Sequence, residues 1–518
     1  MQKRIHTLAL ALLVASAATA QTDLSHGRGR IENVTDYSQP VVSKTRRVGT
    51  RATAPLPAAG SPNVPVILVQ FSDLPFTVEA TDSAVHANYH KFFNGTGIKG
   101  QQYQVSGGIW GSVTDYFIEQ SDSLFQPQFT IIGPVTLSRS YTYYGKDRGN
   151  SHDVNISQFY SEACKLAMSD ANIQWSDFDN NSDGLVDLVF FIYAGVGQNE
   201  STNDDTNTIW PKESVSEISV EVGGNTVTFG AYGCTCELYR QAQDGIGTVC
   251  HELSHGLGLP DLYDTTLHAF GMDYWDVMDS GCYQLDGKQP CGYSAYERDF
   301  MGWRLLETIE SGTQTTLTLH PLQQGGTAYV MKNDGQPSGN EYFILENRQN
   351  IGFDTYLGCP LSTTAHTYGS CHGLLVTHID YLASEWSSNT VNINASHQRV
   401  SPVPADGTLI SYLNERGDAY FKSLHGDLYP GNQNVTELSS YQVFTGTFTQ
   451  KITNITENAD GTITLDINGG SPNAISSPAS FEDMPTQCYT LSGQRVSTPQ
   501  KGINIIRTHG RVKKVFIK

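Results

Sequence analysis

The chain lacks an excess of positive charge, and charged side chains of either sign are sparse. Of its 518 residues, 32 are Lys or Arg and 52 are Asp or Glu, which gives a net charge of −20. With no basic stretch to offset this charge, the composition argues against nucleic-acid binding, and no phosphate loop of the Walker type occurs. Beyond the N-terminus there is no apolar run long enough for a transmembrane helix. The 49 glycines and 26 tyrosines are typical of a globular, strand-rich extracellular protein.

The N-terminus predicts export. Residues 1–20 have the features of a secretory signal, with Lys3 and Arg4 at the charged start and Ala18-Thr19-Ala20 at the cleavage site. We therefore expect a secreted protein, or one attached to the cell surface after export. Residues 21–62 are polar and form either a flexible leader or a pro-segment that is removed during maturation.

Nine cysteines in an exported chain favour disulfides, with one cysteine left over. The spacing singles out two pairs, Cys282 with Cys291 and Cys359 with Cys371. Each bridge is expected to add about 2–3 kcal/mol to the free energy of unfolding where the geometry allows it. A second zinc site is the alternative, but no second pair at ligand spacing completes it.

The most informative segment is His251-Glu252-Leu253-Ser254-His255, with Gly258 and Asp261 after it. Two imidazoles four residues apart on a helix point the same way, so both can bind one metal ion. Glu252 is placed to take a proton from a metal-bound water. Gly258 can end the helix and turn the chain back, which brings Asp261 up as a third ligand. Two nitrogen ligands, one oxygen ligand and an open fourth position are typical of catalytic zinc.

The residues around this motif predict a helix over 245–257. Asp244 is expected to be its N-cap. The apolar residues recur at helical period, which places the histidines at the margin between core and cleft: Ile246, Val249, Cys250, Leu253 and Leu257. An ordinary amphipathic helix with two half-exposed histidines is the alternative, and Gly258 and Asp261 disfavour it.

The sequence after the motif resembles the metzincin zinc peptidases, in which a tight turn with a methionine lies beneath the metal-binding histidines. Met278, within Gly271–Gly281, is the residue similar to that methionine, and Met272 is a weaker candidate. A flexible thioether suits a packing role under a metal site.

More narrowly, the chain resembles the M6 family of secreted metallopeptidases, the immune inhibitor A type. The matching segments run from about Val64 to about Gly431 and are Ile67–Asp73, Gly111–Phe117, Leu259–Asp264, Glu341–Arg348 and Gly373–Asp380. Thr377 departs from the aromatic residue expected in the family, far from the zinc motif in sequence. The segments as a set are much more specific than the five-residue motif.

This resemblance implies Zn²⁺ held by His251, His255 and Asp261, with Glu252 as the general base. Tyr283, soon after the methionine turn, is the candidate for stabilising the oxyanion. A rival arrangement takes the third ligand from a later helix, where Glu297 is the candidate. Gly258 and Met278 favour Asp261.

A second metal site is predicted around Gly184, where oxygen ligands occur at alternate residues. The twelfth position of this loop is Phe190 rather than glutamate, so an EF-hand is excluded. A Ca²⁺ loop that leads into a strand is the preferred interpretation, and a plain polar turn is the alternative. The candidate ligands are Asp177, Asp179, Asn181, Asp183 and Asp187.

The pattern along the chain predicts an α/β, metzincin-like catalytic domain over 63–310, in which strands alternate with helices. Short alternating runs predict an antiparallel β-sandwich domain over 311–470. Residues 471–518 form a Ser/Pro linker and a short β-rich C-terminal tail. The tail resembles the sorting signals of surface-exported Bacteroidetes proteins, which implies outer-membrane secretion machinery as a partner and a bacterium of that type as the source. A small strand pair that docks on the sandwich is the alternative.

These features together predict a secreted zinc endopeptidase that hydrolyses peptide bonds in extracellular proteins. Its partners would be protein or peptide substrates. A function of another class is a surface adhesin or glycan-binding protein with a vestigial peptidase domain. The intact Glu252 disfavours that alternative, because a protein that only binds has no need of the base.

Overall fold

The computed structural model describes most of the chain between residues 54 and 470, together with strands on either side. The described residues are 30–31, 54–95, 110–149, 151–200, 207–239, 241–264, 269–333, 340–359, 369–410, 417–470, 487–490, 495–496, 501–508 and 511–517. The predicted signal and the linker over 471–485 lie outside them. None of the helices in the described part of the chain is long and apolar enough to cross a bilayer.

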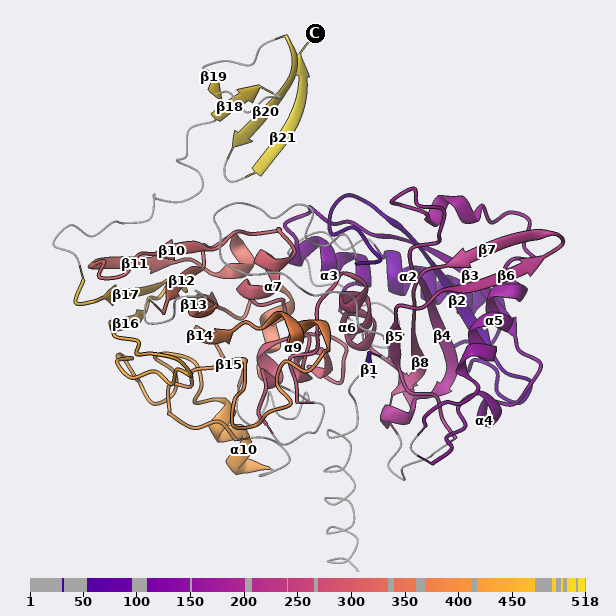
Figure 1. The fold of residues 1–518 in the computed structure, drawn as a ribbon, viewed down its shortest axis with the longest axis horizontal. Coiled ribbons are helices and arrows are strands. Elements are labelled where there is room, and N and C mark those ends of the chain that lie inside the picture. The colour runs from indigo at the N-terminus through magenta and orange to yellow at the C-terminus, as the bar shows by residue number, and fades with distance from the viewer. Residues whose placement is uncertain are drawn as a thin grey trace, which may run out of the picture.

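The N-terminal half is built on a mixed seven-stranded sheet with the strand order β1-β5-β8-β4-β2-β3, and β9 pairs with β8 (Figure 1). The four neighbouring strands β3, β2, β4 and β8 are parallel, with β3 at the edge of the sheet, whereas β5 runs antiparallel to β8. The two continuous apolar runs of the sequence form β2 and β4, which are buried as expected for central parallel strands. The strands are β1 (Arg30–Ile31), β2 (Asn63–Gln70), β3 (Gln128–Thr136), β4 (Val189–Val196), β5 (Lys212–Ser214), β8 (Tyr232–Tyr239) and β9 (Ala242–Gln243).

Helices accompany this sheet. The periodicity near residues 85–93, 111–120 and 154–170 is confirmed by α2 (Asp82–Asn94), α3 (Val113–Gln120) and α5 (Ile156–Ala167). The motif helix is α6 (Gly247–Gly256), and α4 (Tyr141–Tyr144) and α7 (Ala295–Phe300) are shorter. The remaining elements of this half are a hairpin of β6 (Ile218–Val222) and β7 (Asn225–Phe229), and the 3-10 helices η2 (Trp175–Phe178), η3 (Gln198–Glu200), η4 (Asp273–Trp275) and η5 (Ser280–Tyr283).

Two further sheets follow, one of five strands (β10-β12-β13-β14-β15) and one of three (β11-β17-β16). All their pairings are antiparallel except that of β10 with β12. The strands are β10 (Glu307–Ile309), β11 (Thr315–Leu319), β12 (Tyr329–Lys332), β13 (Glu341–Arg348), β14 (Gly373–Asp380), β15 (Val400–Pro402), β16 (Ile452–Glu457) and β17 (Ile463–Ile467). Helices η6 (Leu322–Gln324), η7 (Gly352–Tyr356), α9 (Ala383–Ser387) and α10 (Asp418–Leu424) lie between them.

The central strands of the five-stranded sheet are buried on both faces. On β13, Phe343 and Leu345 belong to a core shared with the three-stranded sheet. Tyr342 and Ile344 belong instead to the core of the N-terminal half. Because side chains alternate across a strand, this sheet is a layer between two cores, and the two halves of the chain fold against each other.

The C-terminal tail contains a separate four-stranded sheet with the order β19-β18-β20-β21. Its strands are antiparallel, so the β-rich character predicted for the tail is confirmed. They are β18 (Gln487–Thr490), β19 (Arg495–Val496), β20 (Gly502–Thr508) and β21 (Arg511–Ile517).

The predicted disulfides are wrong for the described part of the chain. The eight cysteines from Cys164 to Cys371 are all free and buried, including Cys282, Cys291, Cys359 and Cys371. Burial raises the pKa of the Cys371 thiol well above its ordinary value, and the neighbouring Cys359 adds to the effect. These cysteines pack as small apolar side chains.

Candidate metal centre

Helix α6 starts later than the sequence predicted, and no side chain caps it. Its N-cap is Ile246, whereas Asp244 accepts a hydrogen bond from the amide of Gly245 (2.7 Å), so the predicted N-cap is wrong. A Cβ on Gly247 would lie 1.8 Å from the carbonyl oxygen of Cys282. The first turn is therefore fixed by close packing on the segment that follows the methionine turn.

The helix and the turn after it bring three candidate ligands together. Oδ1 of Asp261 lies 3.1 Å from Nε2 of His251 and 3.3 Å from Nε2 of His255. The three residues are at most 2% exposed, and none of these atoms has a hydrogen-bond partner in the described part of the chain. Leaving three buried polar atoms unsatisfied is costly, and a cation between them removes that cost. The donor set of two imidazole nitrogens and one carboxylate oxygen fits zinc.

Backbone carbonyl groups fix the orientation of both imidazoles. Nδ1 of His251 lies 2.9 Å from the carbonyl oxygen of Val277, and Nδ1 of His255 lies 2.7 Å from that of Leu259. Because a carbonyl only accepts, each Nδ1 carries the proton, which leaves the Nε2 lone pair facing the site. Gly258, at φ +94°, makes the left-handed turn that places Leu259 under its own helix.

The acidic ligand is held from a distant part of the sequence. Asp261 donates its amide to Oδ1 of Asn389 (2.7 Å), and Nδ2 of Asn389 donates to Oδ2 of Asp261 (2.6 Å). Burial alone would raise the pKa of Asp261, but the imidazoles of His255 and His251 together outweigh it, and the pKa lies well below its ordinary value. Sequence reasoning missed Asn389, because no local signal connects residues that are 128 positions apart.

Glu252 lies beside the ligand group and is fully buried. Neither carboxylate oxygen has a hydrogen-bond partner among the described residues. Burial raises the pKa of Glu252 to about 8, His251 opposes the shift and Asp261 adds to it. A second carboxylate missed by sequence reasoning is near: burial and then the charge of Glu252 raise the pKa of Glu213, on β5, well above its ordinary value. Glu252 is thus a base that binds protons readily near neutral pH.

The methionine turn packs against the ligands through its backbone. Met278 is fully buried, and its carbonyl oxygen accepts a hydrogen bond from the amide of Leu262 (2.9 Å), next to Asp261. Val277, one residue earlier, is the partner of His251. Tyr283 is also buried. Burial raises the pKa of its phenol well above its ordinary value, and Cys282 and Glu252 are among the groups that add to the shift.

The rival third ligand, Glu297, lies outside the ligand group. Its Oε2 accepts hydrogen bonds from the amide (2.8 Å) and hydroxyl (3.0 Å) of Ser294, which forms a capping box at the start of α7. Burial, and then the neighbouring Asp276, raise the pKa of Glu297 well above its ordinary value. Glu297 therefore helps to cap the start of α7.

The predicted calcium loop gathers three of its five candidate ligands. Carboxylate oxygens of Asp179, Asp183 and Asp187 lie within 4.8 Å of one another. Asn181 is tied to Asp183, accepting a hydrogen bond from its amide (2.8 Å) and donating one to its Oδ2 (2.9 Å). Asp177 lies on η2, outside this group of three carboxylates.

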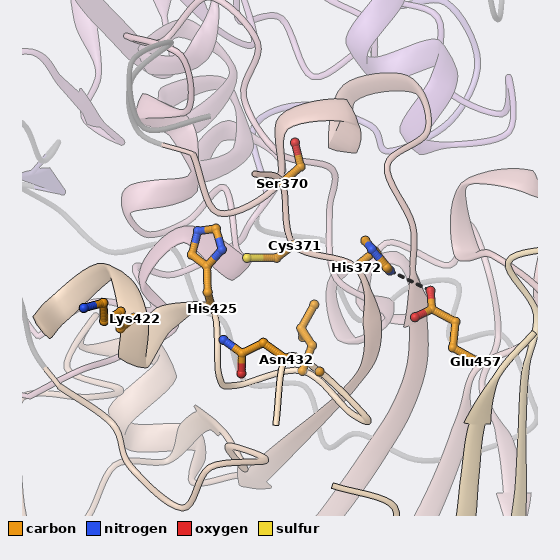
Figure 2. A pocket seen from close by; sticks show the side chains of 9 residues that line it. Ser370, Cys371, His372, Lys422, His425, Asn432 and Glu457 are labelled. Atoms are coloured by element: carbon orange, nitrogen blue, oxygen red, sulfur yellow. Dashed lines mark hydrogen bonds and ion pairs between the residues drawn. The ribbon is translucent and has the colours of Figure 1, made fainter. Parts of the chain in front are cut away.

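A cavity of about 320 Å³ lies in the C-terminal half and contains none of these residues (Figure 2). One side of it carries the pair of His372 and Glu457, with Nδ1 and Oε1 2.7 Å apart. Its other labelled residues come from the approach to β14 and from α10 and the loop after it.

A helix that presents two histidines and a glutamate, followed by an aspartate on a turn, defines a metallopeptidase. Residues 58–306 match the family model described as "Immune inhibitor A peptidase M6, catalytic domain", so this part of the chain is similar to the catalytic domains of the M6 family. The resemblance found in the sequence is confirmed.

Two known proteins are similar to this chain in sequence. Pre-pro-metalloprotease PrtV of Vibrio cholerae is 26% identical over 269 residues, covering 45% of this chain and 29% of the relative. Immune inhibitor A of Bacillus thuringiensis subsp. alesti is 28% identical over 214 residues, covering 36% of this chain and 31% of the relative. The chain thus spans less than a third of the length of either relative.

Proposed function

We propose that the protein is a secreted zinc endopeptidase that hydrolyses peptide bonds in extracellular proteins. The observation that carries this proposal is the convergence of three unsatisfied buried atoms, from His251, His255 and Asp261, beside the unpaired carboxylate of Glu252. The alternative, an adhesin with a vestigial peptidase domain, does not account for the retention of both the ligand set and the base.

The residues of the site have distinct roles in this proposal. Bound Zn²⁺ supplies a Lewis acid that polarises a peptide carbonyl and acidifies the attacking water. Glu252 takes the proton of that water on a carboxylate oxygen and passes it to the leaving amine. Burial raises the pKa of Glu252, and a bound cation beside it would oppose that shift and favour the carboxylate that accepts the proton. Tyr283 is our candidate for a hydrogen bond to the oxyanion.

Zinc removal tests the proposal. The purified protein is expected to contain one zinc ion in the α6 site and to hydrolyse casein. Dialysis against a chelator should abolish hydrolysis, and stoichiometric Zn²⁺ should restore it, because the three ligands have no substitute partners in the described part of the chain. A protein that binds no zinc, or whose activity survives complete zinc removal, contradicts the proposal.

We also propose that Asp179, Asp183 and Asp187, with Asn181, bind Ca²⁺. Oδ1 of Asp187 is buried and has no partner among the described residues, and carboxylates are the ligands that calcium prefers. Burial raises the pKa of Asp187 to about 6, and hydrogen bonds from Asn180 oppose the shift. Without calcium, the folded chain holds this proton more tightly than the unfolded chain does, so this contribution to stability is lost as the pH rises through about 6.

This calcium site predicts a pH-dependent stabilisation. Millimolar Ca²⁺ should raise the unfolding temperature clearly at pH 7.5 and much less at pH 5, because protons compete for Asp187 below about pH 6. Asp187→Asn should remove most of the calcium effect. Asp170→Asn, an exposed change of the same charge, should leave the effect intact. Equal calcium effects in both variants would exclude the site.

The proposed domain organisation includes a pro-segment over 21–62 and a β-sandwich over 311–470. Backbone pairing of Arg30–Ile31 with Lys212–Glu213 adds the leader to the edge of β5, and Glu213 is the residue whose pKa responds to Glu252. We propose that this leader is removed during maturation. Terminal sequencing of the mature protein tests this boundary, and it also shows whether the C-terminal tail is cleaved as a sorting signal.

A further inference from the structure

The third ligand is bound on one oxygen by a residue beyond the matched catalytic segment. Oδ2 of Asp261 accepts from Asn389 at 2.6 Å, and Oδ1 faces the two histidines. Asn389 is 8% exposed and Asp261 1%, so water does not replace this contact. The hydrogen bond from Asn389 to one carboxylate oxygen therefore fixes the direction in which the other oxygen of Asp261 faces the histidines.

Asn389 is itself firmly held. It has φ +52°, a left-handed conformation that asparagine tolerates better than most residues. Its amide donates to the carbonyl of Trp386 (3.2 Å), and the fully buried indole of Trp386 donates to the hydroxyl of Tyr296 (2.6 Å). The end of α9 is therefore anchored to α7, in the middle of the molecule (Figure 1).

A second asparagine of the same segment holds the ligand loop. Nδ2 of Asn392 donates to the carbonyl groups of Leu262 and Val400, both at 2.7 Å. Its Oδ1 accepts from the amides of Arg399 and Val400. The loop that contains Asp261 is thus joined to β15 of the five-stranded sheet, whereas the family match ends at residue 306.

We propose that Asn389 is a positioning residue that orients Asp261 for metal binding, so that the C-terminal half completes the zinc site. This inference rests on the proposed zinc function. A partner of a metal ligand typically changes metal affinity by about 10–100-fold when it is lost. The M6 catalytic segment alone, without residues 386–400, then lacks the groups that fix its third ligand.

The test is zinc affinity, measured by competition with a chromogenic chelator in the full chain. Asn389→Asp keeps the side-chain shape and the acceptor for the Asp261 amide, but it replaces the donor to Oδ2 with a carboxylate oxygen. We expect zinc affinity to fall about 10–100-fold. Asn389→Gly keeps the left-handed backbone and should weaken zinc binding similarly, so a folding defect of one variant does not decide the result.

Asn394→Asp is the matched control, because Asn394 is exposed and lies in the same segment without touching the ligand loop. It should bind zinc within about twofold of the parent, because its added charge is screened by solvent. The unfolding temperature of each zinc-free variant separates a lost metal contact from a general loss of stability. Unchanged zinc affinity in both Asn389 variants overturns the positioning role, whereas a parent chain without zinc overturns the proposed function instead.

Discussion

Glu252→Gln is expected to lower casein hydrolysis by about 10²–10⁴-fold while zinc remains bound. Glutamine preserves the size of the side chain, but its amide cannot take a proton from the attacking water. Zinc binding should persist, because His251, His255 and Asp261 are unchanged and Glu252 is not one of the group. The measurement is the initial rate of hydrolysis together with zinc content from the same preparation.

Glu310→Gln, an exposed change of the same kind, is the control and should retain full activity. Activity that survives in Glu252→Gln would exclude this residue as the base. Loss of zinc from that variant would instead assign Glu252 a role in holding the metal.

Arg348→Met is expected to lower the free energy of unfolding by about 3–5 kcal/mol. The guanidinium of Arg348 is fully buried on β13 and binds both oxygens of Asp354 at 2.8 Å and Glu346 at 3.1 Å. It also donates to the carbonyl groups of Trp275 (3.1 Å) and Gly292 (3.0 Å), on either side of the methionine turn. Methionine fills similar space but leaves two buried carboxylates without their counter-charge.

Urea unfolding followed by tryptophan fluorescence measures this loss. Arg348→Lys keeps the charge with fewer donors and should fall between the parent and Arg348→Met. Lys422→Met removes a cation from an exposed pair with Asp418 and should change stability by about 0–1 kcal/mol. Equal midpoints for Arg348→Met and Lys422→Met would show that the buried network adds nothing to stability.

The sequence predicted what depends on near neighbours along the chain. The spacing of His251 and His255, and the turn at Gly258, are local, and the structure places both imidazoles beside Asp261. The central strands and three helices of the N-terminal half were also predicted, because apolar periodicity is a local signal.

The sequence could not show which residues far apart along the chain are in contact in the fold. Asp244 was predicted as a cap because of its type, yet Gly247 has to approach the Cys282 carbonyl, and that contact decides where α6 begins. The spacing of Cys282 and Cys291 suggested a bridge, but buried thiols are equally suited to packing. Asn389 contacts Asp261, and Arg348 contacts the carbonyl group of Trp275, both from the C-terminal half, and the periodicity of the sequence does not predict such contacts.

The double-sided layer formed by β13 and β14 limits how such a protein can be recombined. Its odd-numbered residues on β13 pack towards the three-stranded sheet, and its even-numbered residues, from Tyr342 to Arg348, pack towards the peptidase half. In a chimaera of this N-terminal half and the C-terminal half of a relative, the side chains where the two halves pack together would not fit each other. Those even-numbered positions would have to be exchanged as well. The part of the chain that has to be exchanged as one unit is therefore larger than the segment that matches the family model.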